Sequence, residues 1–382
     1  MPSPWRSHWP LDPGTAFCNH GSFGACPTAV LEEQQRLRDE MERDPVGFMR
    51  TRREALWDEA RGRFADFVGA DAEGTVLVRN ATTGVNTVLR SWPLRPGDEV
   101  VVTDHGYRAC TLAARRVASD TGANVRVAQL GTPAHDVVDR VLGAVTTRTR
   151  LAVIDHVTSP TGLVLPIADL VRELAARGVE TVVDGAHAPG MVDTDAGSLG
   201  AAAYTGNGHK WMCAPKGAAF LWVRKDLRDD VRPLVTSHGE GVRRPGRSRL
   251  HDRFDWSGTD DPTAFLAVPA AIDTLAGMIE GGWPAIRERN TRLAAWGRAQ
   301  LADAGFTPAG PQDGIGSMAA ALVSPSMTAD EGLALEDRLF DEHRVRAPIT
   351  FVGDAAHVRL SVHLHTDEDD IDRLVEALTR LR

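Results

Sequence analysis

Two short apolar segments, each leading to a charged residue, constrain the fold of this chain most strongly. Thr181–Val183 runs directly into Asp184. Ala201–Tyr204 is followed by the polar stretch Gly206–Trp211, which contains Lys210. Short apolar runs bounded by turn residues are typical of buried strands, and ligands of open α/β sheets bind beyond the carboxyl ends of the strands. We therefore expect the aspartate and the lysine to share one site at the edge of such a sheet.

Lysine is rare in this sequence, and the three lysines differ in their surroundings. The other 40 basic residues are arginines. Lys216 lies in a Pro-Lys-Gly turn and Lys225 in a charged Arg-Lys-Asp segment, both typical of the protein surface. A lysine, unlike an arginine, can lose its proton near neutral pH and add to a carbonyl as an imine. A surface position is the alternative for Lys210 taken alone, and the upstream Asp184 favours a chemical role.

The two segments around these charged residues resemble one known family. Asp184–Gly190 reads Asp-Gly-Ala-His-Ala-Pro-Gly, and Asn207–Gly217 reads Asn-Gly-His-Lys-Trp-Met-Cys-Ala-Pro-Lys-Gly. Both are similar to motifs of the class V aminotransferases, which are fold-type-I pyridoxal-phosphate enzymes, and most similar to the isopenicillin N epimerase-like branch, which includes cysteine-conjugate C–S lyases. The resemblance runs from about Asn19 to the C-terminal helix. It implies pyridoxal 5'-phosphate as cofactor, with Lys210 bound to its aldehyde and Asp184 keeping its pyridine nitrogen protonated.

Strand and helix patterns alternate through the middle of the chain, which predicts a largely parallel sheet covered on both faces. The resemblance implies a large domain with a mostly parallel seven-stranded sheet and a small α+β C-terminal domain. We expect an N-terminal segment over residues 1–50 that packs on the active site, a PLP-binding large domain over 51–280, and a small domain with its linking helix over 281–382. The expected strands are 76–78, 99–102, 124–130, 151–156, 181–183, 201–204, 217–223, 318–323 and 358–362, and the expected helices include 28–43, 53–67, 134–145, 167–177, 329–342 and 367–380.

A candidate phosphate site follows the first expected strand of the sheet. Val76–Val78 leads into the small polar turn Asn80–Gly84 and then into a helix. Such a turn points free backbone N–H groups at a phosphate. Many α/β turns look similar, so the phosphate interpretation depends on the position of this turn upstream of Asp184 and Lys210. The expected donors are Ala81 and Thr82.

The resemblance implies further cofactor contacts. A ring should stack on the pyridine face at Asp104–Tyr107, where His105 and Tyr107 are both candidates; His105 could equally be a strand-end residue bonded to backbone. Ser159 should lie beside the phenolic oxygen of the cofactor. Thr259 should reach the phosphate of a neighbouring subunit, which implies a homodimer with shared sites. The remaining cofactor-binding candidates are His187, Asn207 and His209.

Two regions are expected to bind the substrate. The resemblance implies that Arg359 clamps the substrate α-carboxylate in a bidentate pair. It also implies that the glycine-punctuated turn containing His20, Gly21 and Ser22 lines the pocket, although a simple connector is an equal alternative. The aromatic-plus-Asn pair that the family usually has after the arginine motif is replaced here by His365-Thr366. Because of this departure, the resemblance does not by itself determine the substrate or the reaction.

Several reactions are open within the family. No cysteine follows Cys213, so the persulfide chemistry of cysteine desulfurases is not expected. Lys210 and Asp184 would supply the proton removal and the electron sink that β-elimination needs, whereas an epimerase needs a second acid on the opposite face. We expect cleavage of a cysteine S-conjugate at its C–S bond in secondary or thiol metabolism, with epimerisation, transamination and oxidative deamination as alternatives. A non-enzymatic relative would be expected to lose the lysine or the aspartate.

Composition and charge exclude other classes. A net charge of -9 argues against a nucleic-acid partner, and the chain has no run of 18 apolar residues. The first residues lack the apolar core of a signal peptide, so we expect a cytoplasmic protein. No metal is expected, because the four cysteines lack zinc-ligand spacing. Residues 236–257 are expected to form a mobile loop, whose Arg243–Arg253 part could receive a bulky, polar or anionic substituent of the substrate or simply be solvated.

Overall fold

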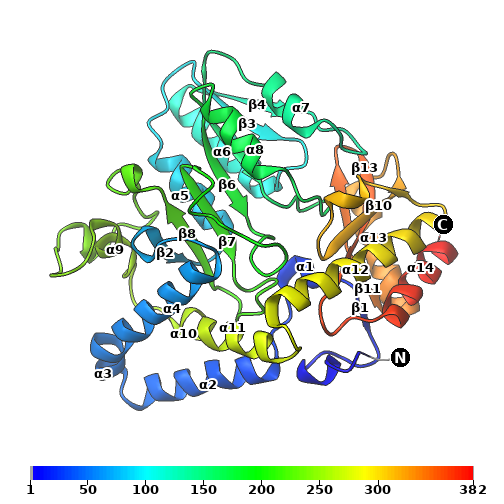
Figure 1. Ribbon diagram of the computed structural model, residues 1–382, viewed down its shortest axis with the longest axis horizontal. Coiled ribbons are helices and arrows are strands. Elements are labelled where there is room, and N and C mark those ends of the chain that lie inside the picture. Colours follow the sequence, from blue (N-terminus) through cyan, green and yellow to red (C-terminus); the bar gives the residue numbers. More distant parts are fainter. Residues whose placement is uncertain (1–2, 382) are drawn as a thin grey trace.

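The computed structural model describes residues 3–381, and a seven-stranded sheet forms its larger part (Figure 1). The strand order is β2-β8-β7-β6-β5-β3-β4. The strands are β2 (Thr75–Val78), β3 (Glu99–Thr103), β4 (Asn124–Ala128), β5 (Thr149–Asp155), β6 (Glu180–Gly185), β7 (Ala203–Asn207) and β8 (Ala219–Val223). Neighbours pair in parallel, except that β8 runs antiparallel to both β2 and β7. The mostly parallel seven-stranded sheet expected from the sequence is confirmed.

Helices cover both faces of this sheet, as alternating side chains of single strands show. Val100 and Val102 of β3 belong to one buried cluster, and Val101 between them belongs to another. Successive side chains of a strand point to opposite faces, so the two clusters are the two faces. On the first face lie α5 (Ala81–Ser91), α6 (Arg108–Thr121) and α9 (Arg249–Phe254). On the second lie α4 (Arg53–Phe67), α7 (Val137–Gly143), α8 (Ile167–Ala175), α10 (Thr263–Leu266) and α11 (Val268–Gly277).

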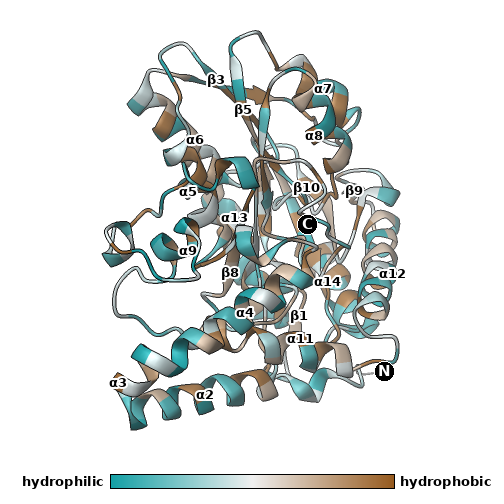
Figure 2. Cartoon of the chain, turned by 60° about the vertical axis from the view of Figure 1, so that its left-hand side comes forward, coloured by the Kyte–Doolittle hydropathy of each residue, from teal (hydrophilic) through white to brown (hydrophobic). Residues whose placement is uncertain are grey.

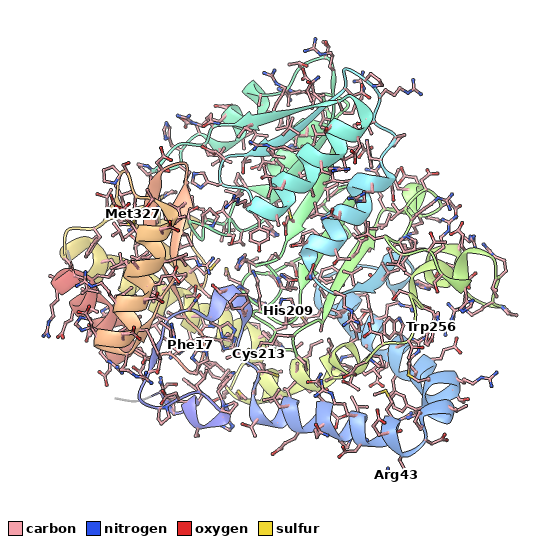
Figure 3. All side chains as sticks on the ribbon, turned by 180° about the vertical axis from the view of Figure 1, so that it is seen from behind. Phe17, Arg43, His209, Cys213, Trp256 and Met327 are labelled. Carbon is pink, nitrogen blue, oxygen red and sulfur yellow. The ribbon has the colours of Figure 1, made fainter. Side chains whose placement is uncertain are left out.

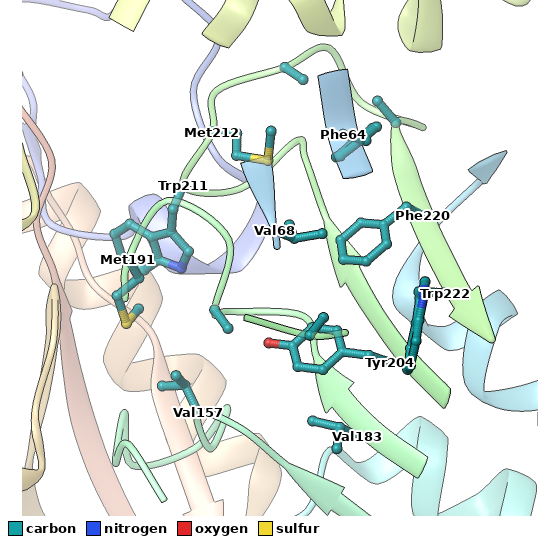
Figure 4. Packing of buried hydrophobic residues seen from close by; sticks show 14 of the residues in the cluster. Phe64, Val68, Val157, Val183, Met191, Tyr204, Trp211, Met212, Phe220 and Trp222 are labelled. Carbon is teal, nitrogen blue, oxygen red and sulfur yellow. The ribbon is translucent and has the colours of Figure 1, made fainter. Parts of the chain in front are cut away.

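Aromatic packing anchors the strand that precedes Lys210. Tyr204 on β7 and Phe220 on β8 are stacked, with ring centroids 6.1 Å apart. Phe64 from α4 lies 5.3 Å from the Phe220 ring, and Figure 4 shows Phe220 between the other two. All three side chains are fully buried. This packing fixes the end of β7, from which the loop carrying Lys210 leaves.

A second, antiparallel sheet with strand order β12-β13-β10-β9 forms the C-terminal part. Its strands are β9 (Thr307–Pro308), β10 (Met318–Ser324), β12 (Ile349–Val352) and β13 (Ala355–Ser361). The helices α12 (Gly282–Asp303), α13 (Ala329–His343) and α14 (Glu368–Leu381) share a separate buried cluster with it. The sequence predicted β10, β13 and the two last helices but missed β12, the hairpin partner of β13.

The N-terminal segment lies between these two parts. β1 (Ala16–Phe17) pairs in parallel with β11 (Val345–Arg346), and α1 (His20–Phe23) then lies between the two sheets (Figure 1). The helices α2 (Thr28–Arg43) and α3 (Pro45–Gly47) follow. Gly24 has φ +71°, and a Cβ there would collide with the carbonyl oxygen of His209. A glycine is therefore needed for this segment to approach the Lys210 loop.

Residues 236–257 differ from the mobile loop expected from the sequence. The second half of this segment forms α9, and its residues are buried. Arg244 pairs with Asp252 at 3.1 Å and with Asp255 at 2.9 Å, and Arg247 pairs with Asp58. These arginines compensate acidic residues of the same chain, so the structure does not support Arg243–Arg253 as a receiver for an anionic substituent.

The long helices of this chain carry both polar and apolar residues. Figure 2 shows hydrophilic and hydrophobic residues along both α2 and α12. Among residues 3–381, no single helix is long and apolar enough to cross a membrane. The bent pair Thr263–Gly277 and Gly282–Asp303, with 70° between its two parts, meets that test jointly by length and composition.

Candidate active site

A cavity of about 210 Å³ lies at the carboxyl ends of β5, β6 and β7. Elements from the whole first half of the chain contribute to its wall, including α1 and the first turn of α5. The lining residues are Ser22, Phe23, Asn80, Ala81, Thr82, Tyr107, Asp155, Ser159, Asp184, Ala186, His187, Asn207, His209 and Lys210. The structure thus brings most of the sequence-predicted residues together at the edge of the sheet.

Strand pairing explains why Asp184 and Lys210 converge. β6 and β7 are parallel neighbours, and Asp184 lies opposite Thr205. The loop after β7 is held by hydrogen bonds from the backbone N–H groups of Gly208 and His209 to the carbonyl oxygen of Ala218, 2.9 and 3.2 Å long. Lys210 therefore leaves the sheet at the same edge as the aspartate. The exposed fraction is 1% for Asp184 and 9% for Lys210.

The surroundings of Lys210 favour its neutral amine. Its Nζ lies 2.9 Å from Nε2 of His187. Burial, followed by the positive charge of Arg359, lowers the pKa of Lys210 to about 7. Burial and then the charge of Lys210 also hold the pKa of His187 well below its ordinary value. A lysine with a lowered pKa is suited to act as a nucleophile or a base.

Asp184 is fixed by two donors and accompanied by a second carboxyl group. The backbone N–H of Ala186 and the thiol of Cys110 each donate to it at 3.0 Å. Its register partner on β5 is Asp155, which lines the same cavity. Burial and then the charge of Asp184 raise the pKa of Asp155 well above its ordinary value, and burial raises the pKa of Asp184. Two buried carboxyl groups favour the binding of a cationic group between them.

Sequence reasoning missed four residues of the cavity wall: Phe23, Asn80, Asp155 and Ala186. For Asp155 a signal was present, because its strand is an apolar run ending in an aspartate, as is the strand before Asp184. Asn80 belongs to the turn that the sequence predicts as a phosphate site. Phe23 and Ala186 carry no sequence signal of their own and only adjoin the predicted residues Ser22 and His187.

The first turn of α5 offers donors to an anion. Asn80 caps the helix, since its Oδ1 accepts the N–H of Thr83 at 2.8 Å. The N–H of Ala81 donates to Oδ1 of Asn207 at 2.8 Å and so already has a partner within the chain. The N–H and hydroxyl of Thr82 have no partner among residues 3–381. Thr82 is therefore the freer of the two predicted donors.

The structure separates the two candidate rings. Tyr107 is 42% exposed and lines the cavity. His105 is buried outside the cavity wall, with Nδ1 2.9 Å from the Thr161 hydroxyl and Nε2 2.8 Å from the Gly131 carbonyl oxygen. The geometry favours Tyr107 as the ring that faces a ligand, and gives His105 the role of a strand-end residue bonded to its neighbours.

Arg359 lies behind the cavity wall and contacts two residues of it. Its Nη1 donates to the carbonyl oxygen of Ser159 at 2.6 Å, and its Nη2 donates to the Ser22 hydroxyl at 2.9 Å. Burial lowers the pKa of this guanidinium to about 10. Within residues 3–381 no carboxylate forms a salt bridge with it. A buried arginine without an acidic partner favours the binding of an anion beside it.

Besides His105 and Arg359, three predicted residues lie outside the cavity wall. His20 is buried, with Nε2 3.0 Å from the carbonyl oxygen of Lys210 and Nδ1 3.0 Å from Nε2 of His365. Gly21 is packed so closely against the small domain that a Cβ would press on it. Thr259 is exposed in the loop between α9 and α10. In the single chain these residues do not form part of the pocket.

His20 also belongs to a buried group that sequence spacing did not signal. Its Nε2, Sγ of Cys213 and a ring nitrogen of His363 lie within 4.8 Å of one another, close enough to hold a metal ion. However, the Nε2 atom of His363 lies 3.2 Å from the carbonyl oxygen of Trp211, and that of His20 bonds to the Lys210 carbonyl. Both nitrogen atoms therefore have partners within the chain.

The fold and this site define an α/β protein in which a buried lysine and a buried aspartate converge at the strand ends. The chain belongs to the class V aminotransferase family, whose profile (Aminotransferase class-V) matches residues 26–374. This family is PLP-dependent, in agreement with the cofactor expected from the sequence.

Relatives and solved structures support the expected branch and fold. Isopenicillin N epimerase of Amycolatopsis lactamdurans is 36% identical, covering 98% of this chain and 97% of the relative. A probable chloroplastic L-cysteine desulfhydrase of Arabidopsis thaliana is 31% identical, covering 97% and 83%. A mutant of C-DES with glycine covalently linked to its PLP cofactor has a TM-score of 0.84 at 21% identity, covering 98% of this chain and 99% of that one. The resemblance to the epimerase-like branch and the fold-type-I architecture are both confirmed.

Proposed function

We propose that this chain is a PLP-dependent lyase that breaks the C–S bond of a cysteine S-conjugate. The observation that supports this most is one cavity lined by Asp184 and by Lys210, a lysine whose pKa burial lowers to about 7. Arg359, which is buried and forms no salt bridge with a described residue, lies directly behind two residues of the same wall. A base, an electron-sink partner and an anion-binding group are the components that such a reaction needs.

The residues present fit the cofactor. The N–H and hydroxyl of Thr82, unpartnered within residues 3–381, lie at a helix N-terminus and suit the phosphate. Asp184 offers a carboxylate for the pyridine nitrogen, and Lys210 offers an amine for the aldehyde. Tyr107 offers a ring at the cavity wall. The other residues assigned to cofactor binding in the same wall are His187, Ser159, Asn207 and His209. When bound, pyridoxal 5'-phosphate accepts electrons from the bonds of the substrate Cα.

The chain's own groups then act on the substrate in sequence. Arg359 binds the α-carboxylate and so fixes which Cα bond faces Lys210. Nζ of Lys210, a neutral amine, takes the Cα proton and becomes an ammonium group. The electron pair of the C–S bond leaves with the sulfur, which takes up a proton as a thiol. With one water, the overall products are the thiol, pyruvate and ammonia.

Epimerisation is the second candidate, and the 36% identity to an isopenicillin N epimerase favours it. Inversion at Cα needs an acid on the face opposite Lys210. Tyr107 lines the cavity and is exposed to it, so it is the stronger candidate for that acid. His20 is less suited, because both of its ring nitrogens are engaged within the chain.

Product analysis with a cysteine thioether or sulfoxide tests the proposal. Pyruvate and ammonia released in step with the thiol or sulfenate support elimination. Solvent deuterium at Cα of an otherwise intact substrate, without pyruvate, would instead establish epimerisation. A keto acid that retains the sulfur would point to transamination or oxidative deamination. Lys210→Ala serves as the control that should abolish all of these products.

A further inference from the structure

Trp211, the residue after Lys210, makes a hydrogen bond that determines how its neighbours share protons. Its indole ring is fully buried, and the indole N–H donates to Nδ1 of His187 at 3.3 Å. Nε2 of the same histidine lies 2.9 Å from Nζ of Lys210. The three side chains thus form a continuous line from the protein interior to the cavity.

The direction of the first bond fixes the protonation of the ring. An indole nitrogen can only donate, so Nδ1 of His187 must accept and carries no proton. A neutral imidazole with a bare Nδ1 has its proton on Nε2. The low pKa that burial gives to His187 keeps this ring neutral at physiological pH.

The second bond then fixes the state of the lysine. The Nε2–H of His187 points at Nζ of Lys210 and needs a lone pair to accept it. A neutral amine has a lone pair, whereas an ammonium group has only donors. If Lys210 were an ammonium group donating to Nε2, the proton of the histidine would move to Nδ1 and face the indole N–H. One hydrogen bond of the line would then be lost.

We propose that Trp211 is a positioning residue that sets the tautomer of His187 and thereby holds Lys210 as a free amine. This inference rests on the proposed function, in which Lys210 must be unprotonated to attack the cofactor aldehyde and to take the Cα proton. Because these hydrogen bonds hold Lys210 as a free amine, no separate deprotonation step is needed each time the lysine is released from the cofactor.

Charged and titratable groups on other elements act on the same lysine. Arg359 on β13 disfavours the ammonium form, and the acidic groups on β5, β6 and α6 favour it. The groups that face Lys210 are Arg359, Asp184, Asp155 and Cys110, and those that face His187 are Lys210, Arg359 and His209. None of them is altered when the indole N–H alone is removed. A Trp211→Phe substitution removes the indole N–H and keeps these charged groups, and the loss of ring volume needs a separate control.

The first test measures how pH controls the reactivity of Lys210. The full chain freed of cofactor is treated with a small amine-specific acetylating reagent across a pH series, and the modified peptides are quantified by mass spectrometry. The exposed Lys216 and Lys225 serve as internal references. In Trp211→Phe, the proton affinity of Lys210 should rise roughly three- to tenfold, so that its reactivity appears at higher pH. An unchanged pH profile would overturn the proposal.

A matched control separates this effect from the loss of a buried indole. Trp283 is also buried, and its N–H donates at 3.1 Å to the carbonyl oxygen of Ile272, outside the cavity wall. Trp283→Phe should leave the pH profile of Lys210 unchanged. An equal shift in both variants would mean that general loosening, rather than the tautomer, is responsible.

The second test needs no tryptophan variant and so decides the question even if Trp211→Phe does not fold. Nitrogen-15 NMR of the wild-type chain labelled at histidine distinguishes the two tautomers, and His187→Gln assigns the signals. We expect a protonated Nε2 and a bare Nδ1. If Nδ1 is protonated and the chain still binds PLP, the proposal for Trp211 is refuted and the proposed function stands. If the expected tautomer is present but the chain does not bind PLP, the proposed function is contradicted instead.

Discussion

At the scale of single residues, the burial of Lys210 couples folding to pH. Its pKa is about 7 in the folded chain, compared with an ordinary value of 10.5. Between these values the unfolded chain binds a proton at this lysine and the folded chain does not. The free energy of unfolding therefore rises with pH through this window. The free-energy cost of burying Lys210 is therefore greatest below this pH window, where both the folded and the unfolded chain carry the proton.

Lys210→Met should reveal this coupling in the cofactor-free chain. The variant should be more stable than the wild type at pH 7, and its advantage should shrink by up to about 1.4 kcal/mol per pH unit as the pH rises toward 10. Urea denaturation at several pH values measures the difference. The exposed Lys225 provides the control, since Lys225→Met should show no such pH dependence. A pH-independent advantage of Lys210→Met would show that the folded lysine is protonated.

At the scale of elements, α1 is tied to both the C-terminal segment and the loop that carries Lys210. His365 donates or accepts at both ring nitrogens, 3.0 Å from His20 and 3.2 Å from the Thr366 hydroxyl. His20 in turn bonds to the carbonyl oxygen of Lys210. The family's usual aromatic residue at this position cannot continue such a line. The histidine therefore joins three segments that are distant in the sequence.

His365→Phe should destabilise the chain by about 1–3 kcal/mol, because the ring shape is retained but a buried nitrogen of His20 loses its partner. Urea denaturation compares the free energy of unfolding of this variant with that of the wild type. His135→Phe, at an exposed position, should change it by less than about 0.5 kcal/mol. Equal stability of His365→Phe and the wild type would mean that water or another group replaces the bond.

At the scale of the whole molecule, we propose a two-fold dimer in which Thr259 reaches the partner's phosphate site. Thr259 is exposed, and the neighbouring surface carries the half-exposed apolar residues Leu234 and Val235. Together with Trp256 these two line a second cavity of about 170 Å³. Trp256 lies on the opposite side of the molecule from Met327 (Figure 3). Because exposed apolar side chains are suited to an interface, we expect Leu234 and Val235 to lie in it.

Val235→Arg should convert the dimer to monomers and reduce activity at least tenfold, because a charge would be buried in the interface and each site would lose the partner's Thr259. Light scattering and sedimentation measure the assembly. Leu333, on α13, has a similarly exposed apolar side chain, and Leu333→Arg should leave the assembly intact. A wild-type monomer with full activity would rule out the shared site.

The sequence by itself determined most of the helices and the strands of the large sheet, although it missed β12 and took α9 for part of a loop. The helices α2 and α4 occupy 28–43 and 53–67 as expected, because their start signals and apolar periodicity are local properties. Asp184 and Lys210 were identified because short apolar runs lead to them, and parallel pairing then required them to share one edge. These features depend on residues within a few positions of one another or on the order of the strands.

The tertiary structure decided which side chains act on one another. Arg359 reaches Ser159 across 200 positions of sequence, and Asp155 faces Asp184 only through the pairing of β5 with β6. The choice between His105 and Tyr107 likewise depended on which ring faces the cavity. Protonation follows from these same contacts, because burial and hydrogen-bond direction set the state of Lys210. No local pattern encodes them, since they arise only when distant segments pack and exclude water.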